Sequence, residues 1–398
     1  MARILFVAPG FTRENIRLQP WRYVYELASQ STGRGNVVVL TNQHDGGQQT
    51  RQQWQEGFEV LATPLLSVRQ QPVLADLIAS LEPVELWWST TPRSIAYLKL
   101  LSQFNCKRIA FMTCPLYSWR ELFFGFRQRA PFCEIKDLLL QRLIPRWLFA
   151  RAMNGELIDS IVVQSRANGD VLRGMGVEAG KIKHLPVGID DDDMGAIDET
   201  VSASVSDRMG SGSGEVKILF LGSPRVIRGF DYLKETFISL YRQRQDVELV
   251  ILARGASEQQ SQKLQSEIEN AAGQGAVQIE SGWLSRDEVW AYLAEADIVV
   301  LPFLLVPSDV PVAALEAMAR GSTLVVSTVD GLPELVADGR GVAVDLSQHD
   351  SLRKVLLELV SDPERRRICG EKARAYMQTY PRWQDVGRQL EEVVANVG

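Results

Sequence analysis

The sequence predicts an α/β protein built from two doubly wound parallel sheets. The chain has 398 residues, which is too long for one ordinary hydrophobic core. Short apolar runs alternate with helical patterns, as in parallel sheets with helices on both faces. This alternation stops at an acidic, then Ser- and Gly-rich stretch, 191–215, and starts again after it.

The first domain is predicted to cover 1–195. Its strands are expected at Arg3–Ala8, Asn36–Thr41, Phe58–Ala62, Glu85–Trp88, Arg108–Thr113 and Ser160–Gln164. Helical patterns lie between them at Trp21–Gln30, Ala75–Leu81 and Pro92–Phe104.

A linker is expected at 196–214, because Gly210–Gly214 consists only of Gly and Ser. The acidic run Asp190–Asp193 precedes it. This run fits either a metal site or a solvated loop at a domain boundary, and we favour the loop.

The second domain is predicted to cover 215–375, followed by a helical tail at 376–398. A helix is expected at Asp231–Arg242. The expected strands are Val216–Leu221, Val247–Ala253, Val277–Ile279, Ile298–Pro302, Thr323–Ser327 and Gly341–Val344.

Composition excludes some classes of function. The net charge of −6 gives no global footprint for nucleic acid. Only three histidines occur, and they are far apart, so we expect no zinc site and no other bound metal. Four cysteines without a CxxC spacing are typical of reduced thiols in a cytoplasmic protein.

The most informative stretch is 302–336. An apolar strand ends in a polar turn, and Pro311 then begins a short Ala-rich helix that ends at Gly321. Free N–H groups near Val310, Pro311 and Val312 favour an anion. Glu316 lies inside this helix, where a carboxylate can accept hydrogen bonds from sugar hydroxyls. Phosphate and hydroxyl recognition together suggest a nucleotide-sugar.

This stretch resembles the donor-binding segment of retaining GT-B glycosyltransferases, in particular glycosyltransferase family 4. Pro307-Ser308, Pro311, Glu316-Ala-Met-Ala and Gly331-Leu-Pro-Glu334 match the family pattern. The first Glu of the family's Glu-x7-Glu pair is replaced by Ser308, and Asp309 follows it. The resemblance implies that Ser308 and Asp309 occupy the loop that faces the transferred sugar, and that Glu316 binds ribose. Either Asp309 takes over the role of the missing Glu or that role is lost.

The resemblance also implies an activity. The expected reaction moves a sugar from a UDP- or GDP-sugar to a hydroxyl of a glycan, lipid-linked or small-molecule acceptor, with retention and without metal or cofactor. The expected fold is GT-B, with two Rossmann-like domains facing across a cleft and the last helix crossing back. Two alternatives are a non-catalytic GT-B partner and a nucleotide-sugar 2-epimerase.

A second segment carries basic residues at the end of a strand. Gly222-Ser223-Pro-Arg225 and then Arg228-Gly229 follow the first strand of the second domain. Guanidinium groups grip phosphates through paired, charge-assisted hydrogen bonds. The resemblance places Arg228 at the family's Lys position, so Arg228 and Arg225 are predicted to neutralise the leaving diphosphate.

Further residues are assigned to the site by the resemblance. Gly255, Trp283 and Leu284 are expected to line the nucleotide pocket. On the first domain, Gly10, Phe11, Trp21, Arg22 and Thr113 are expected to line the acceptor side of the cleft. Cys114 has no nearby His to activate it, so we expect ordinary packing there.

The segment 119–151 combines seven basic residues, three acidic residues and several aromatic rings. Its local charge is +4, while the remainder of the chain is −10. Such a segment fits either peripheral contact with the anionic inner face of a membrane or a pair of helices with ordinary core and solvent faces.

Overall fold

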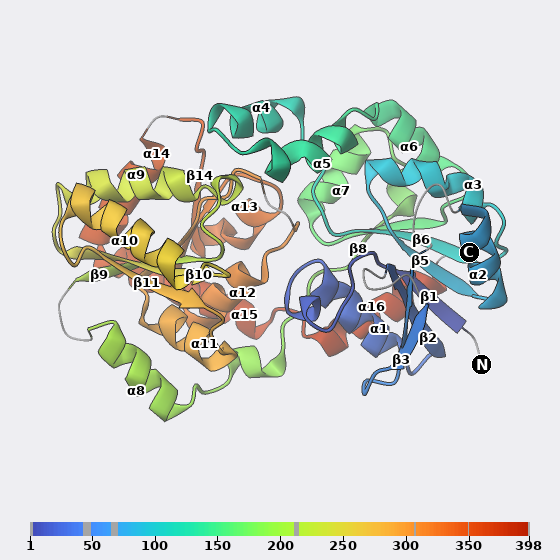
Figure 1. The fold of residues 1–398 in the computed structure, drawn as a ribbon, viewed down its shortest axis with the longest axis horizontal. Helices are drawn as coiled ribbons and strands as arrows, with labels where there is room; N and C mark the ends of the chain where they lie inside the picture. Colours follow the sequence, from blue (N-terminus) through green and yellow to red (C-terminus); the bar gives the residue numbers. More distant parts are fainter. Residues whose placement is uncertain are drawn as a thin grey trace.

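The computed structural model describes residues 3–42, 49–64, 71–210, 215–305, 308–348 and 350–396. It shows two α/β lobes (Figure 1). Residues 211–214 of the predicted linker and Pro307 of the Glu316 motif lie outside this description.

The N-terminal lobe contains an eight-stranded sheet in the order β3-β4-β2-β1-β5-β6-β7-β8. Its strands are parallel except for β3, which pairs antiparallel with β4 at the edge. The strands are β1 (Arg3–Val7), β2 (Asn36–Asn42), β3 (Thr50–Gln53), β4 (Glu59–Thr63), β5 (Glu85–Ser89), β6 (Lys107–Met112), β7 (Ser160–Val163) and β8 (Ile182–His184).

The C-terminal lobe contains a fully parallel six-stranded sheet in the order β11-β10-β9-β12-β13-β14. Its central strands are buried along their whole length, which explains their near-continuous apolar sequence. The strands are β9 (Val216–Leu221), β10 (Val247–Arg254), β11 (Val277–Gly282), β12 (Ile298–Leu301), β13 (Thr323–Ser327) and β14 (Gly341–Val344).

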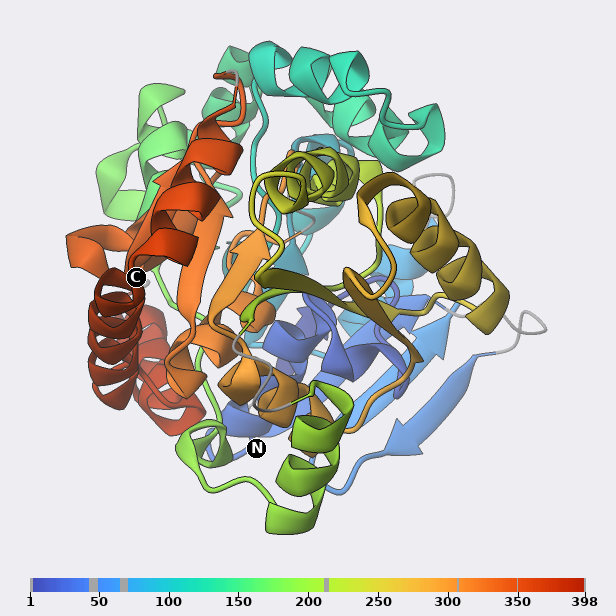
Figure 2. The ribbon, with the colours of Figure 1, turned by 90° about the vertical axis from the view of Figure 1, so that its left-hand side faces the viewer.

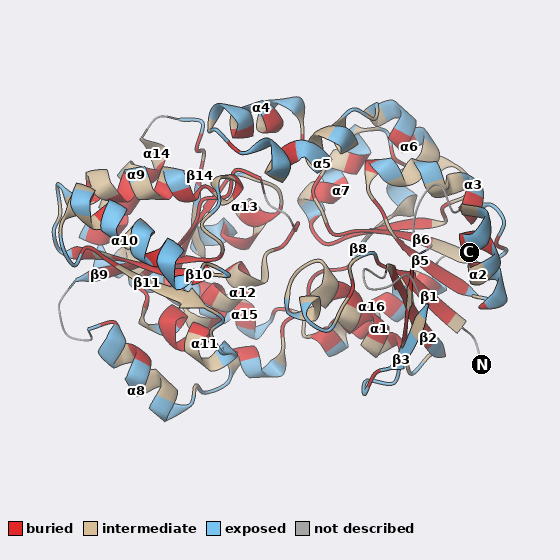
Figure 3. Ribbon diagram, in the orientation of Figure 1, coloured by how far each residue is buried: buried red, intermediate tan, exposed pale blue. Residues whose placement is uncertain are grey.

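Helices cover both sheets (Figures 1 and 3). Those up to η5 are η1 (Asn15–Arg17), α1 (Trp21–Ser31), α2 (Gln71–Ser80), η3 (Pro92–Tyr97), α3 (Leu98–Leu101), α4 (Trp119–Arg127), α5 (Phe132–Arg142), α6 (Arg146–Asn154), α7 (Arg166–Gly174), η4 (Ala179–Lys181) and η5 (Asp191–Met194). The later ones are α8 (Glu199–Arg208), η6 (Val226–Arg228), α9 (Phe230–Tyr241), α10 (Glu258–Ala272), α11 (Arg286–Glu295), α12 (Val312–Arg320), α13 (Leu332–Leu335), η7 (Ala337–Gly339), α14 (Ser351–Ser361), α15 (Pro363–Gln378) and α16 (Trp383–Ala395).

The strand orders place two binding crevices. In each sheet the strand order reverses direction at the first strand. β1 lies between β2 and β5, and β9 lies between β10 and β12. Ligands of doubly wound sheets bind outside the carboxyl ends of the strands at such switch points. The loops after β9 and β12 carry the Arg228 and Glu316 motifs.

The last helix returns to the first lobe. α16 packs against α1, and Leu390 of α16 is fully buried. Lys107 donates its Nζ hydrogen bond to Val394 O at 2.7 Å. The red α16 therefore lies beside the blue α1 in Figure 1, with both chain ends on the same lobe.

The helices α4 and α5 of the N-terminal lobe pack against the C-terminal lobe. Leu122 and Ile135 from these helices form a buried cluster with Ile227 of η6 and with Leu305, which follows β12. Gly125 of α4 permits this contact, since a Cβ there would lie 3.2 Å from Leu305 Cδ1. In Figure 2 the α4–α5 segment lies above the helices of the C-terminal lobe.

Three elements were not expected from the sequence. The edge strands β3 and β8 are short and exposed or half-buried, so they lack an apolar run. α8 falls within the predicted linker, where Ser and Asp obscure its helical pattern. Asp198 caps its first turn, and the helix packs against α11.

A substitution in α16 tests the return of the tail. Leu390→Ala removes a fully buried side chain, so we expect the free energy of unfolding to fall by about 2–5 kcal/mol. Denaturant unfolding measures it. The exposed neighbour Glu391→Ala should change stability by no more than about 0.5 kcal/mol, and equal effects of the two variants would contradict this packing.

Candidate active site

Two glycines shape the loop that carries Arg228. Gly229 has φ +67°, and a Cβ there would lie only 1.7 Å from Pro302 O. Gly222 has φ +135°, and a Cβ there would lie 2.8 Å from Nη1 of Arg228. Because neither position has a side chain, η6 packs directly onto the end of β12 and the Arg228 guanidinium packs onto Gly222.

Arg228 is a half-buried cation. Burial, together with the like charges of Arg254 and Arg225, lowers its pKa to about 10. Its Cζ lies 5.5 Å from the centre of the Phe303 ring. Among the described residues no carboxylate forms an ion pair with it, whereas the more exposed Arg225 lies 4.0 Å from Glu134. A desolvated guanidinium that lacks a protein partner is suited to bind an anion.

The second feature is a cavity of about 420 Å³ lined by Glu316, which we call the Glu316 cavity. Glu316 projects from the middle of α12, a helix that begins after Pro311 and ends at Gly321 with φ +81°. Pro311 is the N-cap residue, so the helix begins at Val312, one residue later than predicted.

The carboxylate of Glu316 faces mixed charge. The pKa of this carboxyl is raised to about 7. Burial is the largest cause and Asp193 also raises the pKa, whereas Arg254 and Arg286 lower it. In the described part of the chain it makes no hydrogen bond or ion pair. Its oxygens are therefore available to hydroxyl donors in the cavity.

Four of the nine predicted donor residues line this cavity, Glu316 among them. Val312, Trp283 and Leu284 line the Glu316 cavity. Gly255, with φ +75°, has open space beside its α-carbon and follows Arg254 of the cavity wall. Val310 is buried before α12, and Ser223 is half-buried in the loop of Arg228.

Ion pairs between the lobes close one wall of the cavity. Arg22 of the N-terminal lobe lies 2.8 Å from Asp190, and Arg286 of α11 lies 2.8 Å from Asp190 and 2.6 Å from Asp193. Arg22 therefore lines the Glu316 cavity and not a separate acceptor surface. The acidic run is structural, and not merely a solvated loop as favoured from the sequence.

Three cavity residues were missed by sequence reasoning. Arg254 ends the buried strand β10, and its charge there, at the carboxyl edge of a sheet, is a signal that could have found it. Asp193 and Arg286 offer no local signal, since their pairing joins positions 93 residues apart.

The loop before α12 is held by the other lobe. Asp309 is fully buried, and its Oδ1 accepts a 2.7 Å hydrogen bond from Ser165 Oγ. Its backbone N–H donates to Thr113 O at 2.9 Å. Asp309 therefore faces the start of α7, not the Glu316 cavity, and Thr113 contributes a backbone contact. Ser308 is buried as well, and its Oγ lacks a hydrogen-bond partner.

Glu334 reinforces this contact. Its carboxylate accepts hydrogen bonds from the backbone N–H groups of Arg166 and Ala167 at 3.3 and 2.5 Å. The first turn of α7 is thus capped by carboxylates from the opposite lobe, as suits a helix N-terminus.

The remaining N-terminal residues are mainly structural. Phe11 is 1% exposed, and the centre of its ring lies 5.2 Å from the centre of the Trp54 ring. The prediction that Phe11 lines the cleft is therefore wrong. Its position follows from an aromatic core that its local sequence does not reveal. Trp21 covers Gly10 and donates its Nε1 hydrogen bond to Pro9 O. Burial raises the pKa of Cys114 to about 11.

Comparison with known proteins identifies the class. Residues 206–376 match the family model for Glycosyl transferases group 1. The C-terminal lobe therefore belongs to this family, and the resemblance seen in the Glu316 motif is confirmed.

Characterised relatives are distant. The chain is 28% identical over 172 residues to a GDP-mannose-dependent monoacylated alpha-(1-6)-phosphatidylinositol monomannoside mannosyltransferase of Corynebacterium glutamicum, covering 42% of this chain and 44% of the relative. It is 26% identical over 266 residues to the MMP alpha-(1->4)-mannosyltransferase of Mycolicibacterium hassiacum, covering 64% of this chain and 60% of that protein. The chain thus spans about half the length of the curated relatives it matches.

Solved structures share the whole fold. A sucrose-phosphate synthase from Thermosynechococcus elongatus superposes with a TM-score of 0.73 at 16% identity, over 99% of this chain and 98% of that chain. The Anabaena protein HepE, solved in complex with UDP, gives a TM-score of 0.72 at 14% identity, over 99% of this chain and 100% of that chain. These likenesses show that the fold is GT-B, as predicted.

The buried Asp309 carboxyl predicts a pH effect on stability. Burial raises its pKa to about 6, above an unfolded value of about 3.9. The folded state therefore binds more protons between about pH 4 and pH 6, and the free energy of unfolding falls as pH rises, by at most about 3 kcal/mol.

Asp309→Asn keeps an acceptor for Ser165 and removes the buried charge. Relative to wild type, this variant should be more stable at about pH 8 than at about pH 4, by up to about 3 kcal/mol. Denaturant unfolding at both pH values measures the difference. Asp76→Asn on the exposed face of α2 should show none, and a flat difference for Asp309→Asn would contradict the prediction.

Proposed function

We propose that this chain transfers a sugar from a nucleoside-diphosphate-sugar to an acceptor hydroxyl. The observation that carries the proposal is the half-buried guanidinium of Arg228, which has no carboxylate partner among the described residues and has like charges on Arg254 and Arg225 nearby. Three guanidinium groups at the end of one sheet favour a ligand with more than one negative charge.

Each part of the site has a role in this proposal. Arg228, Arg225 and the N–H groups that begin α12 stabilise the departing diphosphate, which is electrostatic catalysis. Glu316 accepts hydrogen bonds from the ribose hydroxyls. Trp283 is 65% exposed and stands with Leu284 at the wall of the Glu316 cavity, where a base can pack.

Retention and independence from metal fit these residues. The guanidinium groups supply positive charge at the leaving group, so the acceptor can attack from the same face with a phosphate oxygen taking its proton. The relative that uses GDP-mannose and the neighbour that binds UDP support a nucleotide donor.

A non-catalytic nucleotide-sugar-binding protein is the second candidate. It is favoured by one observation: Ser308 replaces the expected carboxylate, and Asp309 is engaged by Ser165. A 2-epimerase is disfavoured, because the chain has only three histidines.

A thermal-shift screen with UDP, GDP, ADP and dTDP tests the donor site. At a hundredfold excess over its Kd, the correct nucleotide should raise stability by about 2.7 kcal/mol. Arg228→Ala and Glu316→Ala should weaken binding about 10–100-fold, since each removes charge-assisted hydrogen bonds worth about 1.5–3 kcal/mol. The exposed Glu258→Ala on α10 is the matched control.

Two further outcomes separate the candidates. Donor hydrolysis or transfer that persists in EDTA supports the metal-independent enzyme. Nucleotide binding without turnover would favour the non-catalytic protein, and no shift with any nucleotide would overturn both.

We also propose that the N-terminal lobe contacts an anionic membrane through the face formed by α4, α5 and α6. These helices lie along the upper edge of Figure 1, with exposed residues on all three in Figure 3. Among the described residues, eight of the twelve exposed large hydrophobic side chains lie here: Trp119, Phe123, Phe126, Phe132, Leu140, Leu143, Trp147 and Leu148.

Charge complementarity selects the lipid surface. The segment 119–151 carries +4 within a chain of net charge −6, so an anionic bilayer attracts this face and repels the remainder. Aromatic side chains among basic residues are typical of interfacial binding. No helix in the described ranges is both long and apolar enough to cross a bilayer.

Vesicle co-sedimentation tests this contact. Binding to vesicles with anionic lipid should exceed binding to neutral vesicles and weaken with salt. The variant Phe123→Ser/Phe132→Ser/Trp147→Ser should lose most of the binding. The control Val73→Ser/Val84→Ser removes exposed side chains elsewhere on the lobe, and an equal loss there would argue against a specific face.

A further inference from the structure

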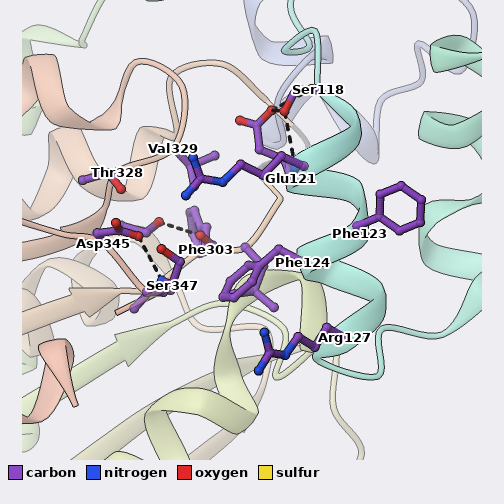
Figure 4. A pocket seen from close by; sticks show the side chains of 14 residues that line it. Ser118, Glu121, Phe123, Phe124, Arg127, Phe303, Thr328, Val329, Asp345 and Ser347 are labelled. Carbon is purple, nitrogen blue, oxygen red and sulfur yellow. Dashed lines mark hydrogen bonds between the residues drawn. The ribbon is translucent and has the colours of Figure 1, made fainter. Parts of the chain in front are cut away.

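A second cavity, of about 770 Å³, lies between α4 and the carboxyl ends of β12, β13 and β14. Figure 4 shows α4 on one side of it and the loops of the C-terminal lobe on the other. We call it the α4 cavity. Its size falls within the range of small-molecule sites, and the donor site described above does not use it.

Two of its four charged groups are guanidinium groups that can bind an anion. Arg120 and Arg127 line it from α4, and neither forms an ion pair among the described residues. Glu121 is occupied, since its carboxylate accepts 2.6 Å hydrogen bonds from Ser118 N and Ser118 Oγ. Two guanidinium groups without partners suit one phosphate group.

The opposite wall offers polar groups to hydroxyls. Thr328, Ser347 and Asp345 line it. Hydrogen bonds from Ser347 lower the pKa of the Asp345 carboxyl, and the charge of Arg120 contributes to a smaller extent. Asp345 Oδ1 already accepts a 2.9 Å hydrogen bond from Ser347 N, which fixes its orientation. A small set of oriented polar groups against an apolar floor is typical of a specific ligand site.

Aromatic rings form that floor and connect it to the donor site. Phe124 points into the cavity and Phe123 points away from it (Figure 4). Phe303 lines the α4 cavity, and the Arg228 guanidinium lies 5.5 Å from its ring centre. One ring thus separates the α4 cavity from the proposed diphosphate site, while Phe123, 65% exposed, lies on the proposed membrane face.

We propose that the α4 cavity binds the phosphorylated sugar or polyol headgroup of the acceptor. The phosphate pairs with Arg120 and Arg127, and the hydroxyls contact Asp345 and the rim of β13 and β14. This inference rests on the proposed function, whose acceptor it specifies. A lipid chain attached to such a headgroup can leave the cavity alongside α4 toward the bilayer.

Calorimetric titration tests the proposal without donor. The probes are glucose 6-phosphate, mannose 6-phosphate, fructose 6-phosphate and inositol 1-phosphate, each compared with its unphosphorylated form and with inorganic phosphate. We expect at least one phosphorylated probe to bind at least tenfold more tightly than both comparison compounds. Arg120→Ala/Arg127→Ala should weaken that binding at least tenfold, and Asp345→Asn should weaken it too.

Both arginines are exposed, so the double variant should fold, and its nucleoside-diphosphate thermal shift should equal that of wild type. Arg151→Ala, an exposed arginine of α6 outside the cavity, is the control. Absence of binding by every probe, or inorganic phosphate binding as tightly as the phosphorylated probes, would overturn the proposal. If no nucleoside diphosphate produces a thermal shift with the wild-type protein, the proposed donor site is overturned instead.

Discussion

The site depends on the partial burial of one guanidinium group that has no counter-ion within the described parts of the chain. Gly222 and Gly229 make room for Arg228 and for direct contact of its loop with Pro302 O. Burial of such a charge is costly unless something pairs with it. The lowered pKa of Arg228 reflects this cost, because desolvation disfavours the charged form of the guanidinium. An anion that binds there would pair with the guanidinium and offset the free-energy cost of its desolvation, which favours binding.

The two lobes are coupled around that charge. The cluster of Leu122, Ile135, Ile227 and Leu305 packs helices of the N-terminal lobe onto the loop of Arg228. Carboxylates of the C-terminal lobe cap α7, and Asp190 joins Arg22 to Arg286. Lobe movement would thus alter the Glu316 cavity and the α4 cavity together. Phe303 lines the α4 cavity and also contacts the Arg228 guanidinium, so its ring lies between the α4 cavity and the proposed diphosphate site.

Sequence reasoning worked best where local pattern and burial agree. The strands β9 and β13 have the predicted bounds, because the central strands of a parallel sheet are continuous apolar runs. The helix of Glu316 and its Gly321 terminus were found for the same reason. The edge strand β14 also has the predicted bounds. Short edge strands and the polar helix α8 were missed, since their stability comes from neighbouring elements and not from their own periodicity.

The sequence by itself determined the fold class, the family of the C-terminal lobe and the positions of Arg228 and Glu316. These depend on glycine geometry, helix ends and apolar runs, which are local in the chain. Tertiary structure decided that Phe11 is core, that Asp309 accepts a hydrogen bond from Ser165, and that Arg22 lines the Glu316 cavity. Such contacts join residues more than a hundred positions apart or belong to a shared core. Their partners are chosen by how the two sheets pack, which no local pattern encodes.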